Sequence, residues 1–277
     1  VMFYNKRIIN ESGLEDPYDV WKRGEWDWDT FREYLDATTY DEDGDGTMDV
    51  HGLSVSYDFL TAFVASTGEE HIEFDGSTFV NNMKSQRVRD AADFLYSIGV
   101  NNKGYVNMGN FVSTFITGRS AFTFTNDYRG HVDFSKMWER DGLGIVPMPE
   151  YPGAEEPYQA ALADNLWLMK GAKNPEGAGL LALAERYDQL LNVNPEFPTK
   201  READIQTWID RGYTQEAAEA CVDISEMPKK VLYSRAIFFA DGAIESRMMD
   251  FPWTTLADSA YGEVDKAIKD ATTPVAQ

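Results

Sequence analysis

The 277-residue chain carries 47 acidic and 25 basic side chains, which gives a formal net charge of −22 at pH 7. This charge excludes a broad phosphate-binding or acidic-membrane surface, because such surfaces need clustered lysine and arginine, and it favours a soluble monomer. The hydrophobic fraction of 43% is typical of a globular protein of one large or two modest domains, and no stretch approaches the roughly 18 apolar residues of a membrane span.

Short apolar runs alternate with amphipathic stretches along the chain, which predicts an α/β fold. Residues 1–4 predict a buried strand and residues 5–11 a short helix, followed by a loop at 16–24. Asp27 is a good N-cap for the next helix, whose Trp28, Phe31 and Leu35 are spaced to face a core. Further strands are predicted at 52–56, 121–125, 143–147 and 165–169. Further helices are predicted at 84–98, 110–116, 175–187, 201–211, 214–220 and 254–271. Residues 57–66 are predicted to form an aromatic-rich helix or loop.

An acidic stretch at residues 41–49 follows the D-x-D-x-D-G pattern of a calcium loop. Its candidate ligands are Asp41, Asp43, Asp45, the Thr47 carbonyl and Asp49. The bidentate glutamate expected at the twelfth position is a glycine here, which argues against a true EF-hand. Two interpretations remain open: a structural Ca²⁺ that staples the loop, and a solvated acidic turn without an ion.

Aromatic side chains are abundant, with 14 Tyr, 16 Phe and 7 Trp. Sugar-binding clefts use aromatic faces for the rings and carboxylates or amides for the hydroxyls. Open α/β sheets bind ligands beyond the carboxyl ends of their strands. Two clusters follow predicted strands and are candidate ligand-binding residues: Tyr57, Asp58 and Phe59, and Asn126, Asp127 and Tyr128. Ordinary core aromatics and loop polar groups are the alternative interpretation.

Signatures of catalysis are missing from the sequence, which contains no nucleophile elbow, phosphate loop, dinucleotide-binding loop or zinc-protease helix. The single cysteine, Cys221, lies in an apolar helical run and is interpreted as a small core residue rather than a nucleophile. Carboxylates are plentiful, but nothing singles out a pair for glycoside hydrolysis. These observations favour a protein that is not an enzyme.

Several short segments carry a family resemblance. They are residues 1–6 (VMFYNK), 12–17 with 28–31, 41–53, 115–122 (FITGRSAF), 142–149 (GLGIVPMP), 173–176 (KNPE) and 264–271 (VDKAIKDA). In this order and spacing they resemble the extracellular solute-binding proteins of bacterial ABC importers, the maltose-binding-protein-like family. Each match is weak alone, but together they cover almost the whole chain.

The resemblance implies an α/β periplasmic-binding-protein-like lobe of type II, with a mixed sheet flanked by helices. In the family, a first lobe precedes the segment that matches residues 1–6, so that lobe is expected to be largely absent. Residues 1–160 would form the second-lobe core, 161–195 a crossover that packs on the first lobe, and 196–277 the return with C-terminal helices. Trp167 and the apolar face of the 175–187 helix would then lack partners.

The same resemblance implies ligand contacts at Tyr128, at Tyr57, Asp58 and Phe59, and near Arg247. It implies non-covalent capture of a sugar or oligosaccharide and delivery to an ABC permease in the membrane. The place of action would be extracytoplasmic, at the cell surface as a lipoprotein or in the periplasm. Two alternatives remain open: a carbohydrate-active enzyme, and a binding protein for a peptide or cationic solute. The role of residues 191–227 cannot be predicted.

Overall fold

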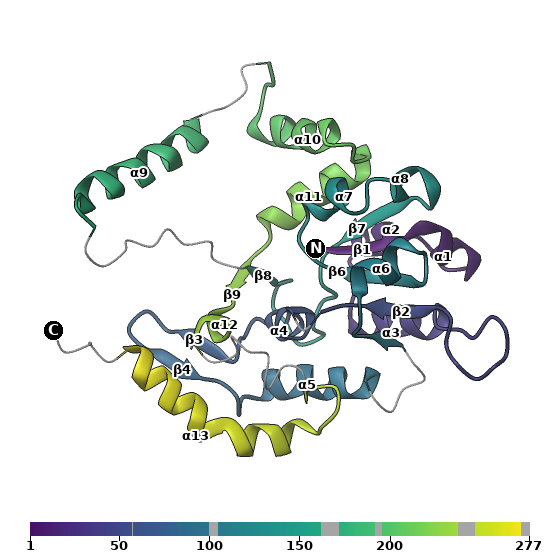
Figure 1. Ribbon diagram of the computed structural model, residues 1–277, viewed down its shortest axis with the longest axis horizontal. Helices are drawn as coiled ribbons and strands as arrows, with labels where there is room; N and C mark the ends of the chain where they lie inside the picture. Colours follow the sequence, from purple (N-terminus) through teal and green to yellow (C-terminus); the bar gives the residue numbers. More distant parts are fainter. Residues whose placement is uncertain (57, 100–104, 162–171, 192–195, 238–246, 273–277) are drawn as a thin grey trace.

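The computed structural model describes residues 1–56, 58–99, 105–161, 172–191, 196–237 and 247–272. At its centre is a five-stranded sheet with the strand order β5-β2-β6-β1-β7 (Figure 1). β1 runs antiparallel to β6 and β7, whereas β2 is parallel to β5 and β6, so the sheet is mixed as expected. The strands are β1 (Met2–Asn5), β2 (His51–Ser54), β5 (Val106–Asn107), β6 (Ser120–Phe124) and β7 (Leu143–Val146).

Side-chain alternation along β1 divides the interior into two cores. Met2 and Tyr4 point into a first core, and Phe3 points into a second core on the other side of the sheet. All three side chains are fully buried. Successive residues of a strand face opposite sides, so a fully buried strand of this kind requires helices on both faces.

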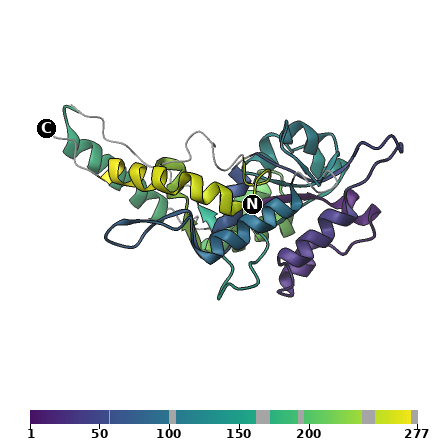
Figure 2. The same cartoon turned by 90° about the horizontal axis from the view of Figure 1, so that it is seen from below.

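The first core lies under a layer of helices that includes the C-terminal one, seen from below in Figure 2. Trp28 stacks on Phe63 with ring centroids 4.7 Å apart, and Phe63 stacks on Phe94 at 4.9 Å. These rings join three helices that are distant in sequence. The helices of this layer are α1 (Lys6–Glu11), α3 (Trp28–Ala37), α4 (Asp58–Ala65), α5 (Gln86–Ile98) and α13 (Trp253–Thr272).

The second core lies on the other face and centres on Phe3, Phe134 and Ile145. The edge of the Phe134 ring meets Phe3 with centroids 5.2 Å apart. The helices around this core are α6 (Phe111–Ile116), α7 (Arg129–Val132), α8 (Met137–Arg140), α10 (Lys200–Asp210) and α11 (Gln215–Glu226). α11 extends six residues beyond the predicted end at Ala220.

Two small sheets complete the described part of the fold. β3 (Ile72–Phe74) and β4 (Phe79–Asn81) form an antiparallel hairpin, whose turn is held by Asp75 accepting from the backbone of Ser77 and Thr78. β8 (Gln159–Ala161) and β9 (Lys229–Val231) pair in parallel, and α12 (Tyr233–Ile237) follows. The β8–β9 pair joins segments that lie about 70 residues apart, so no local sequence pattern could predict it.

The loop predicted at residues 16–24 is wrong in part, because this stretch contains the helix α2 (Pro17–Lys22). The Asp16 side chain caps the Tyr18 amide, and Pro17 occupies the first helical turn. Both residues favour a helix start as well as a turn. The predicted strand at 165–169, with Trp167, lies outside the described residues.

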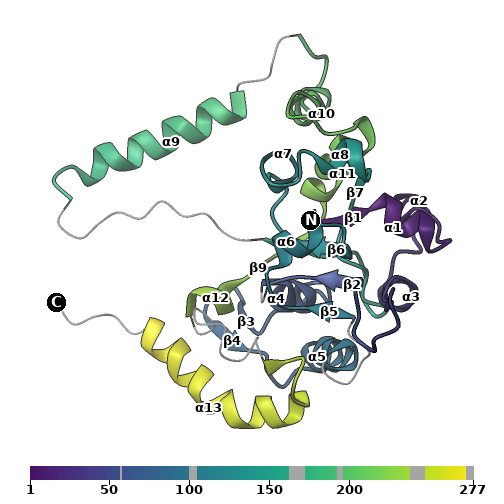
Figure 3. The same cartoon turned by 45° about the vertical axis from the view of Figure 1, so that its right-hand side comes forward.

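α9 (Pro175–Leu191) extends away from the sheet, as Figures 1 and 3 show. Its Leu180, Leu181, Leu183 and Tyr187 side chains are all more than 60% exposed. The exposure expected for the apolar face of this helix is therefore confirmed.

Among the described residues, no helix combines the length and apolar character needed to cross a bilayer.

Candidate functional site

A cavity of about 720 Å³ opens where the parallel strands β2 and β6 end. Ser56 and Asp58 follow β2, and the segment 125–129 follows β6. A further part of the wall comes from β8, through Ala160, and from Leu232 just after β9. The cavity thus occupies the position at which open α/β sheets bind ligands.

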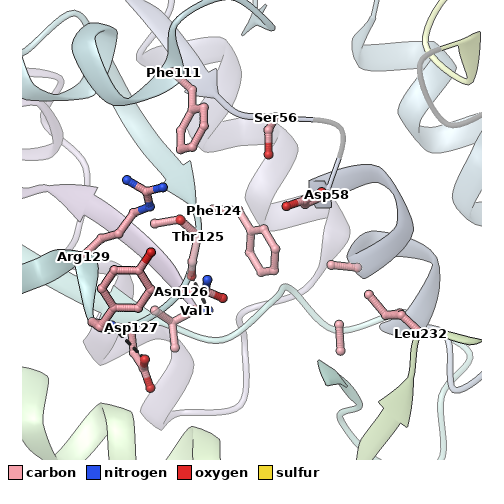
Figure 4. Close-up of a pocket in the computed structure, with 13 residues that line it drawn as sticks. Val1, Ser56, Asp58, Phe111, Phe124, Thr125, Asn126, Asp127, Arg129 and Leu232 are labelled. Atoms are coloured by element: carbon pink, nitrogen blue, oxygen red, sulfur yellow. Dashed lines mark hydrogen bonds between the residues drawn. The ribbon is translucent and has the colours of Figure 1, made fainter. Parts of the chain in front are cut away.

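Side chains of mixed chemistry line this cavity (Figure 4). Phe111, Phe124 and Tyr128 supply aromatic faces, and Tyr128 is 42% exposed. Asp58 and Arg129 reach in from opposite walls. The lining residues are Val1, Ser56, Asp58, Ala62, Phe111, Phe124, Thr125, Asn126, Asp127, Tyr128, Arg129, Ala160 and Leu232.

Arg129 is held in place by one acidic partner and two rings. Its guanidinium pairs with Asp133 one turn further along the chain and lies 5.8 Å from the ring centroids of both Phe111 and Tyr128. Its Nε is buried and finds no hydrogen-bond acceptor among the described residues. Buried donors are almost always satisfied, so this N–H is one of the few exceptions among the described side chains.

Four of the predicted ligand-binding residues, Asp58, Asn126, Asp127 and Tyr128, line the cavity together. Phe59 does not line it: its side chain is fully buried against Phe63 and Phe124, which places it behind the cavity wall.

The remaining two predicted ligand-binding residues cannot be placed at the cavity. Arg247 lies over the Phe251 ring, 4.7 Å from its centroid, outside the lining. Tyr57 lies outside the described residues.

Sequence reasoning missed several lining residues. Ser56 and Thr125 lie within two residues of the ends of β2 and β6 and could have been found by the same strand-end rule as Asp58. Phe111 begins a short helix, and Ala160 and Leu232 come from the β8–β9 pairing, which carries no local signal.

A second cavity of about 220 Å³ adjoins the first and shares Val1, Phe124, Asn126, Asp127 and Ala160 with it. Its own lining includes Cys221 and Lys229. The Lys229 ammonium donates to the Ile224 carbonyl at 2.6 Å and therefore closes the C-terminal end of α11. The two adjoining cavities have room for a ligand longer than one sugar ring.

The acidic loop lies at the far end of the molecule from α9, between α3 and β2 (Figure 1). Carboxylate oxygens of Asp41, Asp43 and Asp49 all lie within 4.8 Å of one another. The structure therefore brings together three of the predicted metal ligands. Asp45 lies outside this group, and its carboxylate accepts from the Thr47 amide at 2.7 Å.

Backbone amides already organise this loop. The Gly46 amide, together with that of Gly44, donates to Asp41 and lowers the pKa of its carboxyl group. A carboxylate that stays ionised to lower pH remains available as an oxygen ligand for a hard cation.

Comparisons with solved structures identify the fold. A maltose/maltodextrin-binding domain from Bdellovibrio bacteriovorus bound to maltotriose matches 97% of this chain and 70% of its own, at 18% identity and a TM-score of 0.64. An ABC substrate-binding protein from Listeria monocytogenes in complex with cycloalternan matches 99% and 70%, at 14% identity and a TM-score of 0.63. A UgpB protein from Mycobacterium tuberculosis in complex with glycerophosphocholine matches 98% and 69%, at 15% identity and a TM-score of 0.61.

The chain therefore has the α/β fold of the maltose-binding-protein-like solute-binding proteins, as its sequence motifs indicate. No family model matches the sequence, and no curated protein matches it. The similar structures bind different solutes, so the fold alone does not name the ligand.

Proposed function

We propose that this protein binds a sugar or short oligosaccharide non-covalently, as the extracytoplasmic solute-binding component of an ABC importer. The observation that carries the proposal is the cavity at the strand ends, where three aromatic rings and several polar groups meet. Aromatic faces suit the C–H faces of sugar rings, and the carboxylates and the Arg129 guanidinium suit hydroxyl groups. The two adjoining cavities favour more than one ring.

In this function the protein would act as a monomer outside the cytoplasm, anchored as a cell-surface lipoprotein or free in the periplasm, and would deliver its solute to a membrane permease. It would carry out no chemical step. The high net negative charge supports the monomeric state, since like-charged surfaces repel each other.

Calorimetric titration with maltotriose tests the sugar-binding proposal. We expect Tyr128→Ala to weaken binding about tenfold, because removing an aromatic contact costs on the order of 1.4 kcal/mol. Tyr187→Ala is the matched control, since that ring is 65% exposed on α9, away from the cavity. Equal affinities of the two variants would contradict the placement of the site.

Titrations with spermidine and with a basic peptide test the alternative of a cationic solute, because Asp58 and Asp127 both line the cavity. Affinity for these compounds without affinity for maltotriose would overturn the sugar proposal. Turnover of maltotriose or a chromogenic glycoside, lost on substitution of one of these carboxylates, would instead favour a carbohydrate-active enzyme.

We also propose that the acidic loop binds one Ca²⁺ through Asp41, Asp43 and Asp49, with the Thr47 carbonyl as a further ligand. The convergence of three carboxylates in a D-x-D-x-D-G sequence supports this role. An ion there would relieve repulsion among the aspartates and hold the loop in one conformation.

Thermal unfolding with and without a chelator tests the calcium proposal. We expect calcium to raise the melting temperature, and Asp41→Asn to abolish that rise, because binding to the folded state alone stabilises it. Asp75→Asn is a matched control, since Asp75 also accepts backbone hydrogen bonds in an exposed turn but lies elsewhere. A melting temperature that is unchanged by both chelator and calcium would reject the site.

A further inference from the structure

The segment from α10 to α11, whose role the sequence leaves open, packs directly behind the cavity. The residues 126–130, which follow β6 and include the first two residues of α7, are called the binding loop below, because Asn126 to Arg129 all line the cavity. α10 and α11 belong to the second core, and Tyr213 in the turn between them is 4% exposed. Tyr213 is not among the residues that line the cavity.

Tyr213 holds the binding loop by its backbone. Its hydroxyl group donates a hydrogen bond to the Asp127 carbonyl oxygen, which also accepts from the Gly130 amide at 3.1 Å. The Tyr213 ring lies so close to Gly130 that a Cβ atom there would collide with the hydroxyl group. Only glycine therefore allows this close contact, and the Tyr213 ring limits how near the loop backbone can come to it.

Two tryptophans extend this support. The Trp138 indole N–H donates to the Gly130 carbonyl oxygen at 2.9 Å. The Tyr213 ring packs between Trp138, 4.9 Å away, and Trp208, 5.0 Å away. The carbonyls of Asp127 and Gly130 are thus both anchored to aromatic side chains that come from other elements.

Within the binding loop, the bonds that hold the backbone are short-range ones, such as the bond from the Arg129 amide to the Asn126 carbonyl at 3.2 Å. α7 has only four residues, and Tyr128 at its N-cap makes no side-chain capping hydrogen bond. A loop that must adopt one conformation to bind a ligand loses affinity in proportion to the time that it spends in other conformations. External anchoring of the loop backbone removes that loss.

We propose that Tyr213 is a positioning residue for ligand binding, which acts through the Asp127 carbonyl and makes the α10–α11 segment a brace for the binding loop. The inference rests on the proposed function for its effect on affinity, but the brace itself is a property of the ligand-free protein. Burial, followed by the nearby Cys221 and Asp127, raises the pKa of the Tyr213 hydroxyl group, so it remains a donor throughout the physiological range.

The test compares Tyr213→Phe with Tyr34→Phe. The control removes the same kind of bond, since the Tyr34 hydroxyl donates to the Glu15 carbonyl at 2.9 Å, away from the cavity. Hydrogen exchange of the amides from Arg129 to Asp133 is measured in the ligand-free proteins, and maltotriose affinity is measured by calorimetry. We expect Tyr213→Phe to speed exchange at these amides and weaken maltotriose about fivefold, whereas Tyr34→Phe changes neither.

Each outcome decides a separate claim. Unchanged exchange in Tyr213→Phe overturns the brace, and faster exchange with unchanged affinity overturns the positioning role. If the wild-type protein binds no maltotriose, the proposed function loses its support, and the exchange measurement alone still decides the brace. If Tyr213→Phe does not fold, Trp138→Phe provides a second test of the brace, because it removes the indole N–H that donates to the Gly130 carbonyl. We expect this variant to speed hydrogen exchange at the same amides.

Discussion

Cys221 lies on α11 with its side chain in the second core, where it is 4% exposed. Burial, followed by the charge of Asp127, raises the pKa of its thiol from 9.0 to about 12. A thiol of this kind is a poor nucleophile at neutral pH, because the reactive thiolate is scarcely populated. The interpretation of Cys221 as a core residue agrees with both its burial and its pKa.

The raised pKa predicts that Cys221 makes the protein less stable at alkaline pH. Between pH 9 and 12 the unfolded state loses a thiol proton that the folded state keeps, so the free energy of unfolding falls as pH rises. From pH 8 to pH 10 this loss is on the order of 1.4 kcal/mol. Urea unfolding at both pH values should show a smaller loss for Cys221→Ala than for the wild-type protein.

The Cys221→Ala variant creates a cavity and therefore starts from a lower stability at pH 8. The prediction concerns only the difference between the two pH values, in which that cavity cancels. The raised pKa of Tyr4 affects both proteins alike and also cancels. The pKa of Tyr213 is raised partly by Cys221, so the Cys221→Ala change lowers it and acts in the same direction as the predicted difference. Equal pH dependence in the two proteins would show that the thiol is not protected in the folded state.

Individual residues of the candidate site could be predicted only where they lie just after a strand, because the end of the strand places them at the cavity. Asp58 and Asn126 lie just beyond β2 and β6, so the strand-end rule places them on the cavity. Phe59 follows the same strand, but α4 has already begun at Asp58, and one step around a helix turns the Phe59 side chain into the first core. Arg247 was placed by resemblance alone, in a region where few motifs fix the alignment.

At the scale of elements, the sequence predicted long helices well because their apolar periodicity repeats several times. α5 begins two residues after the predicted start and ends where predicted, with Val88, Ala91 and Leu95 in the first core. α2 was missed because six residues contain less than two helical turns, and its Asp-Pro start is also a turn signal. The β8–β9 pair was missed because it joins distant segments.

α9 shows that a helix can be predicted from sequence even where the surface that it packs against cannot. Asn174 and Pro175 predict a helix start, and the helix begins at Pro175. Its leucines at 180, 181 and 183 nevertheless remain exposed, so the part of this helix up to residue 187 adds little apolar burial to either core. A periodic sequence determines that a helix forms, whereas its stability in a protein depends on the surface that covers its apolar face.

At the scale of the whole molecule, charge is the dominant imbalance. With 47 acidic and 25 basic residues, at least 22 carboxylates have no basic residue of their own. The ion pairs that do form, such as Lys6 with Asp16 and Glu216, lie mostly at partly exposed positions. Exposed pairs contribute about 0–1 kcal/mol each, so they do not offset the general repulsion.

This imbalance predicts opposite responses of stability and ligand binding to salt. Raising sodium chloride from 50 to 500 mM should raise the melting temperature by several degrees, because screening weakens repulsion that favours the unfolded chain. Affinity for maltotriose, a neutral ligand, should stay within about twofold, whereas binding of a cation such as spermidine would weaken strongly. Chelator in every sample excludes a contribution from the acidic loop, and potassium chloride should act like sodium chloride. A melting temperature that falls with salt would mean that the surface ion pairs outweigh the repulsion.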